Sequence, residues 1–129
     1  MQYFAYKTYI DNICTDEYMT FFADPKAISA FFGRASATSR LDDIDIRFRR
    51  DVCKYRDLGL NVIEIRNGMK ERFGEAGGNV SEFTLEELLA ELIFCAVHER
   101  MYTGFFRECC ETGYVSSLLI EIQKRRKAL

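Results

Sequence analysis

Residues 95–114, CAVHERMYTGFFRECCETGY, contain the chain's only histidine and three of its five cysteines. Cysteine and histidine are common ligands of zinc, and a cysteine beside a histidine can also act as an activated nucleophile. Three interpretations of the segment are therefore open: a metal site, a catalytic site and part of a helix core.

A zinc site in this segment would use Cys95, His98, Cys109 and Cys110 as its ligands. Cys95 and His98 are three residues apart and share one face of a helix. If that helix is continuous, Cys109 lies about 21 Å along its axis from Cys95, beyond the reach of a single ion. The ligands could meet only if Gly104 turned the chain back on itself. We therefore expect no metal and no cofactor.

The directions in which these side chains point on a helix argue against a catalytic role. A cysteine–histidine nucleophile needs a group that orients the base, and an oxyanion hole. Cys95 and His98 point to the same side in mid-helix, and Glu99 faces about 100° away from His98. We therefore predict that the protein is not an enzyme. Cys95 and Cys109 are expected to pack as small apolar side chains, and His98 to pair with Glu91 or Glu99.

The segment GRASATSRL, residues 33–41, is the best candidate for a small-ligand site. Two arginines bracket three hydroxyl side chains there, and the five residues are Arg34, Ser36, Thr38, Ser39 and Arg40. Gly33 is expected to end the preceding helix, and free N–H groups at the start of the next helix favour an anion. A phosphate-bearing or nucleotide ligand bound by the 33–40 loop is one functional alternative. A capped polar linker is the simpler interpretation.

Arg47, Arg50 and Lys54 recur at the spacing of one helix face. Such a basic stripe is typical of a surface that follows the phosphates of a nucleic acid. Asp43, Asp51 and Asp57 lie three or four residues from these cations, so most of the cations can be paired along the helix. Nucleic-acid binding through the stripe is therefore a second alternative, and a solvated face of ion pairs is favoured over it.

Composition indicates one globular domain that spans residues 1–129. Apolar residues make up 48% of the chain and charged residues 29%, which is typical of folded proteins. The sequence lacks an apolar run long enough for a membrane span and the organisation of a secretory signal. An odd number of cysteines, two of them adjacent at 109 and 110, predicts free thiols in a reducing compartment, and so a cytoplasmic location.

Most segments have a helical period, and one proline and eight glycines leave few breakers. Residues 2–13 alternate like a strand and also space like a helix. We expect a helix there, with a short N-terminal strand as the alternative. Asp24 followed by Pro25 is typical of a helix start, with the aspartate as N-cap and the proline in the first helical position.

The clearest pattern lies in residues 41–73, where apolar side chains recur every seven positions, at Leu41, Phe48, Tyr55, Val62 and Met69. The pattern predicts either one long helix or two helices that meet with a kink at Gly59. Thr84 and Glu87 match a capping box, which predicts that the next helix begins there. We predict an all-α helical bundle built on a long antiparallel helical hairpin, 41–73 against 84–112.

The aromatic content favours a protein-binding function. Eleven Phe and seven Tyr form more flat apolar surface than a compact monomer of this size easily buries. We predict a regulatory, adaptor or inhibitor protein that binds another protein and self-associates as a homodimer. Its expected interface residues are Phe48, Tyr55, Val62, Met69, Tyr102 and Phe106. The net charge of −2 argues against a general polyanion binder.

Overall fold

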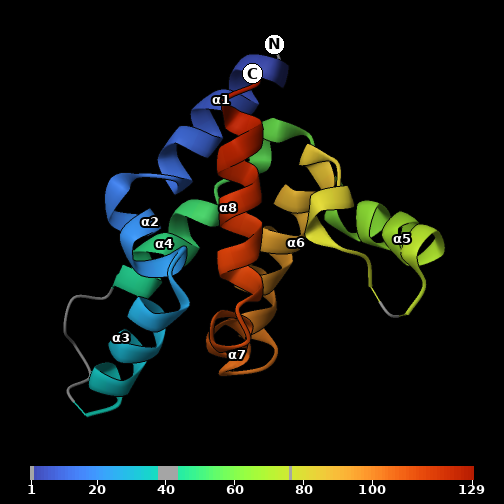
Figure 1. Cartoon of the computed structure of the whole chain (residues 1–129). Coiled ribbons are helices and arrows are strands. Elements are labelled where there is room, and N and C mark those ends of the chain that lie inside the picture. The colour runs from blue at the N-terminus through green and yellow to red at the C-terminus, as the bar shows by residue number, and fades with distance from the viewer. Residues whose placement is uncertain (1, 38–43, 76) are drawn as a thin grey trace.

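The computed structural model of the chain describes residues 2–37, 44–75 and 77–129 (Figure 1). These residues form helices and turns, with no strand among them, so the prediction of an all-α fold is confirmed. None of the helices in these ranges combines the length and the apolar composition needed to cross a bilayer. The elements are, in chain order, α1 (Gln2–Ile13), α2 (Asp16–Phe22), α3 (Pro25–Ala37), α4 (Ile44–Val52), η1 (Arg56–Leu58), α5 (Val62–Phe73), η2 (Val80–Glu82), α6 (Leu85–Val97), η3 (His98–Arg100), α7 (Phe105–Glu111) and α8 (Tyr114–Arg126).

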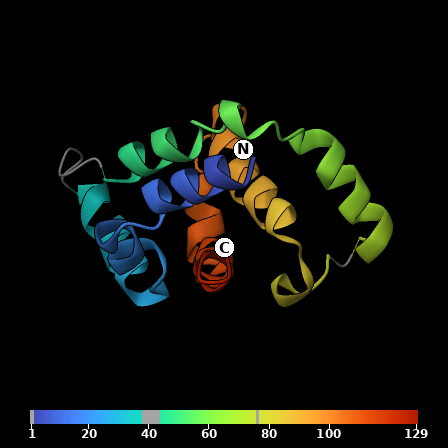
Figure 2. The ribbon, with the colours of Figure 1, turned by 90° about the horizontal axis from the view of Figure 1, so that it is seen from above.

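Helix α8 runs through the middle of the molecule (Figure 1). It packs against α6, α7, α1 and α2. Viewed from above, α3 and α5 lie at opposite ends of an arc, with α8 between them (Figure 2). Helix α4 approaches α6 from the side of α1, and α5 packs on α6 from the opposite side.

An aromatic cluster lies in the core where α2, α4 and α7 meet. Phe22, Phe48 and Phe106 come from these three helices and are buried almost completely. The rings of Phe22 and Phe48 stack with their centroids 4.3 Å apart, and the Phe106 ring lies 6.1 Å from each. The hydroxyl of Ser116 in α8 donates a buried hydrogen bond of 2.8 Å to the carbonyl oxygen of Phe22. The cluster therefore joins helices that are far apart in the sequence.

The helix starts predicted from the sequence are confirmed. Asp24 precedes α3, and its carboxylate accepts a hydrogen bond of 3.0 Å from the backbone N–H of Lys26. Thr84 and Glu87 form the predicted capping box at the start of α6. Each of these signals lies within three residues of the backbone groups that it satisfies, and so needs no distant part of the chain.

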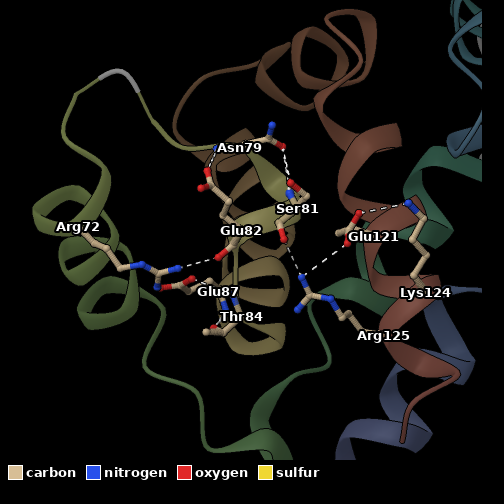
Figure 3. Close-up of polar contacts among 9 residues, drawn as sticks. All are labelled: Arg72, Asn79, Ser81, Glu82, Thr84, Glu87, Glu121, Lys124 and Arg125. Carbon is tan, nitrogen blue, oxygen red and sulfur yellow. Dashed lines mark hydrogen bonds and ion pairs between the residues drawn. The ribbon is translucent and has the colours of Figure 1, made fainter.

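A second capping box, formed by Asn79 and Glu82, begins η2 and was not predicted. Two arginines bind the backbone of this short helix from different sides (Figure 3). Arg72 of α5 donates to the carbonyl oxygen of Glu82 at 2.7 Å, and Arg125 of α8 donates to that of Ser81 at 3.2 Å. η2 therefore links α5 with α8 just before the N-terminus of α6.

Residues 2–13 form α1, so the alternative of an N-terminal strand is wrong. Tyr9, Ile10 and Ile13 are buried, and they share one helix face because Tyr9 and Ile10 lie four and three residues before Ile13. The strand-like alternation in this segment reflects exposed aromatic side chains such as Phe4, which is 73% exposed.

The segment 41–73 does not form a single helix. α4 ends at Val52 and α5 begins at Val62, and a turn with the short helix η1 separates them. Gly59 has a φ of 69° in this turn, the left-handed conformation that glycine adopts without strain. Asn61 then caps α5. The two-helix alternative placed the break correctly, but a stretch of non-α-helical backbone replaces the expected kink.

The second half of the predicted hairpin, 84–112, is also interrupted. α6 ends at Val97, and Gly104 turns the chain with a φ of 94° before α7 begins. Gly33 was expected to end the third helix, whereas α3 continues to Ala37. The bundle is therefore built from shorter helices than the periodicity indicated.

Gly104 and Gly68 provide a matched test of the turn before α7. A Cβ atom would meet nothing within 4 Å at either position, so only the backbone conformation differs between the two sites. Gly104→Ala forces an L side chain into the left-handed region and should lower the free energy of unfolding by about 1–2 kcal/mol. Gly68→Ala, inside α5, should raise it by about 0.5–1 kcal/mol. Urea unfolding measures both changes, and an unchanged stability of Gly104→Ala would contradict the turn.

Candidate functional site

The cysteine-rich segment does turn back on itself at Gly104. α6 ends at Val97, and α7 begins after Gly104 and packs against α6, so the assumption of one continuous helix is wrong. Within residues 2–37, 44–75 and 77–129, however, no three His, Cys, Asp or Glu side chains are placed to bind one metal ion.

Aromatic rings surround His98. Its imidazole stacks on Phe94 with the ring centroids 4.6 Å apart. The Tyr102 and Phe105 rings lie 4.9 Å and 4.7 Å from it. His98 therefore belongs to an aromatic group on the surface of α6 and α7.

The carboxylates expected to pair with His98 bind other groups instead. Glu91 accepts hydrogen bonds from Arg66 at 2.7 Å and from the Tyr114 hydroxyl at 2.6 Å. Glu99 accepts from the backbone N–H groups of Gly104 and Phe106, and so stabilises the start of α7. The predicted pairing of His98 with Glu91 or Glu99 is wrong, because both carboxylates stabilise other contacts of the fold.

The residues predicted to hold an anion are only partly described. Thr38, Ser39 and Arg40 lie outside the described residues. Arg34 and Ser36 lie within α3, which extends to Ala37, and not in a loop after Gly33. A helix interior uses its N–H groups for its own hydrogen bonds. The start of the next helix is the remaining source of free N–H groups, so the anion site at 33–40 stays a prediction.

Of the six residues expected at an interface, three are part of the chain's own core. Phe48 and Phe106 are 0% and 2% exposed, and Met69 is 7% exposed. Tyr55 and Val62 are half-buried. Tyr102 is 63% exposed and is the one large apolar side chain of the six that offers free surface. The heptad seam is divided between α4 and α5, which pack against α6 from two sides, so most of it is covered within the chain.

The basic stripe predicted on residues 47–54 is divided between two surfaces. Arg47 forms two hydrogen bonds to the carboxylate of Glu17, at 3.0 Å and 3.1 Å, and Lys54 lies 3.3 Å from Asp51. Both cations line a hollow that faces α1. Arg50 lines a different hollow, between α4 and α6. The structure therefore separates Arg50 from the other two members of the stripe.

Arg50 belongs to a group of arginines that the sequence did not bring together. Two hollows, of about 500 Å³ and 270 Å³, adjoin along the seam between α4–η1 and the end of α6. Cys53 and Arg100 line both of them. We call this surface the arginine groove and define it by six residues, Arg49, Arg50, Cys53, Tyr55, Arg56 and Arg100.

The positive charge of the arginine groove is only slightly neutralised. Arg50, Arg56 and Arg100 are exposed, and none of them forms an ion pair with a residue in the described part of the chain. Arg49 lies 3.7 Å from Asp45 of its own helix. Burial raises the pKa of the Cys53 thiol, and the positive charges of Arg100 and Arg49 act in the opposite direction. Both guanidinium groups therefore favour the thiolate form of Cys53.

Buried contacts anchor two of the elements that form the groove, α4 and η1. Phe48 and Val52 anchor α4, and the Tyr9 hydroxyl of α1 donates a hydrogen bond to the carbonyl oxygen of Val52. Leu58 is 2% exposed and anchors η1, which presents Arg56. Half-buried Tyr55, Leu60 and Val97 add an apolar floor.

The groove combines two kinds of recognition. A guanidinium group binds a carboxylate or a phosphate with two parallel hydrogen bonds, and it keeps its charge at all accessible pH values. The apolar floor can accept an aliphatic or aromatic side chain. The sequence alone does not link Arg100 to Arg50 and Arg56, because no local pattern connects positions so far apart.

The acidity of Cys53 should report the charge of the groove. Arg100→Ala removes a positive charge that favours the thiolate, so the pKa of Cys53 should rise further above its ordinary value. The midpoint of the pH profile for alkylation by iodoacetamide, followed at Cys53 by peptide mass mapping, should then move upward. Lys54→Ala is the matched control, because that ammonium already pairs with Asp51. Equal midpoints in wild type and Arg100→Ala would show that the guanidinium does not act at this site.

Comparisons with known proteins add no precedent for this geometry. The chain matched none of the protein-family models, curated proteins or solved structures with which it was compared. The function is therefore argued from the residues of the chain itself.

Proposed function

We propose that this chain is a non-enzymatic protein-binding protein that captures an acidic segment of its partner in the arginine groove. The supporting observation is the convergence of Arg50, Arg56 and Arg100 over a half-buried apolar floor. These arginines come from three separate elements, and none has an ion-pair partner in the described ranges. A regulatory, adaptor or inhibitory role follows from binding without chemistry.

An acidic peptide fits this surface better than a lone anion does. The two hollows adjoin at Cys53 and Arg100 and together measure more than a single anion needs, so the groove has room for several residues of a peptide segment. Apolar surface continues beside the arginines, because Ile46 is 43% exposed, and Met101 directly after Arg100 is 76% exposed. A partner segment that alternates carboxylates with apolar side chains would match both the charge and the floor.

Nucleic acid is the less favoured partner. Its affinity comes from many phosphate contacts in a row, and the groove offers few unpaired cations. The other basic side chains of the predicted stripe, Arg47 and Lys54, already bind Glu17 and Asp51. The chain as a whole carries a net charge of −2, which also opposes a polyanion.

A second copy of the chain is one source of an acidic segment. Residues 74–112 carry eight acidic and two basic groups, a local charge of −6. Self-association would place exposed carboxylates of this stretch in one copy, such as those of Glu75 and Glu86, at the arginine groove of the other. Sedimentation of the wild type at two salt concentrations tests this source, because salt weakens contacts between exposed charges.

Binding of a labelled amphipathic peptide of alternating Glu and Leu residues tests the proposal. Followed by fluorescence anisotropy at low salt, it should bind the wild type. Arg56→Ala combined with Arg100→Ala should weaken binding by about tenfold or more, which corresponds to ~1.4 kcal/mol. The matched control combines Lys26→Ala with Lys127→Ala, which removes the same charge from exposed positions outside the groove.

The control and two further probes decide between the outcomes. An equal loss of affinity in both double variants would show that net charge, and not the groove, attracts the peptide. The same peptide with Gln in place of Glu should bind weakly. A single-stranded DNA probe that bound better than the acidic peptide, with a steep salt dependence, would favour the nucleic-acid alternative instead.

A further inference from the structure

A hollow of about 640 Å³ lies beside α5 and shares no lining residue with the arginine groove. It is lined by α5, by glycines of the turn that follows, and by side chains from α6, α8 and the approach to α6. Hollows of roughly 300–1,000 Å³ that combine apolar walls with a few polar groups are typical of small-molecule sites. We call it the α5 hollow.

Three apolar side chains form the wall of the α5 hollow. Phe83 and Met69 are 4% and 7% exposed, and Phe73 is half-buried. The rings of Phe73 and Phe83 lie 5.3 Å apart and are tilted by 51°. Aromatic rings attract a further ring by edge-to-face or offset contacts. The wall therefore suits a ligand with a flat aromatic body.

Two contacts hold the Phe73 ring in place. The Arg72 guanidinium lies 4.3 Å from the ring centroid, and it is itself bound to the carboxylate of Glu87 and the carbonyl oxygen of Glu82 (Figure 3). The turn passes so close to the ring at Gly78 that a Cβ atom there would lie 2.3 Å from a ring carbon. The ring cannot move towards Gly78, so this part of the wall has a fixed shape.

Arg66 is held in one orientation at the α5 hollow. Its Nε donates a hydrogen bond of 2.7 Å to Glu91, and its guanidinium lies 3.5 Å from the centroid of the Phe94 ring. The other oxygen of Glu91 accepts from the Tyr114 hydroxyl at 2.6 Å. The two terminal nitrogens of Arg66 form no hydrogen bond with the described residues. They can donate in parallel to a carboxylate from a side chain that is already ordered.

Lys70 adds a second positive charge one helical turn after Arg66. It is exposed, lines the same hollow and forms no ion pair in the described part of the chain. Glu75 also lines the hollow without such an ion pair, whereas the charge of Glu91 is offset by Arg66. The Glu75 carboxylate repels a dianion more than a monoanion. The charges therefore favour a carboxylate over a phosphate ester.

We propose that the α5 hollow binds a small aromatic carboxylate. The carboxylate accepts two hydrogen bonds from Arg66 and is attracted by Lys70, while the ring packs against Phe73 and Phe83. The inference does not depend on the partner of the arginine groove, because the two surfaces have no residue in common.

Isothermal titration calorimetry of the folded full chain with naphthalene-2-carboxylate tests the charge recognition. One ligand should bind per chain, and the uncharged naphthalene-2-carboxamide should bind about tenfold more weakly or worse. Lys70→Gln should weaken binding of the carboxylate by about three- to fivefold, and Glu75→Gln should strengthen it by a similar factor. The matched control is Lys26→Gln in α3, at the opposite end of the arc (Figure 2), which should leave the affinity unchanged.

A pair of glycine variants tests the aromatic wall. The Cβ atom of Gly78→Ala must displace the Phe73 ring, so this variant should weaken binding of naphthalene-2-carboxylate by about tenfold. Gly68→Ala in α5 is the matched control, because a Cβ atom there meets nothing within 4 Å. It should bind as the wild type does.

Four results would overturn the inference. They are no saturable binding by the wild type, equal affinities for carboxylate and carboxamide, equal losses in Lys70→Gln and Lys26→Gln, and equal affinities of Gly78→Ala and the wild type. A loss of binding in the Arg56→Ala, Arg100→Ala double variant would also reject it, because the carboxylate would then occupy the arginine groove. Circular dichroism establishes that each variant is folded. If Gly78→Ala is unstable, the charge variants at exposed positions decide the question without it.

Discussion

The stack of Phe22 on Phe48 is the contact on which the described architecture depends most. Phe48 lies in the middle of α4, so the position of its ring fixes the rotation of that helix about its axis. Arg47 is thereby directed to Glu17 of α2, and Arg49 and Arg50 towards α6. A buried phenylalanine contributes roughly 1.5–3 kcal/mol through burial alone, more than an exposed ion pair supplies. The aromatic core therefore decides which face of α4 its arginines occupy.

Two interruptions of the helical run shape the region around the arginine groove. The turn with Gly59 in the left-handed conformation ends the α4–η1 segment and brings Tyr55 and Arg56 beside the end of α6. The turn at Gly104 redirects the chain, so that α7 packs against α6 and η3. Without the first interruption, Arg50 and Arg56 would follow one straight helix.

The sequence was sufficient where the decisive contacts are local. The capping box of Thr84 and Glu87 and the Asp24–Pro25 start satisfy backbone groups a few residues away, so these helix starts were predicted correctly. The lengths of the helices were not predicted correctly, because the apolar spacing of seven residues continues through the turn between α4 and α5. The arginine groove could not be found either, since only tertiary packing brings Arg100 to Arg50.

Chemical-shift mapping by NMR tests the central claim, that the arginine groove is the binding surface, most directly. Unlabelled acidic Glu–Leu peptide would be titrated into the ¹⁵N-labelled chain, and the perturbed backbone amides would be assigned. The account predicts that the largest changes lie in residues 49–60 and 96–102, which carry the groove. Changes centred on α5 or on the last turns of α8, with the groove unperturbed, would contradict it.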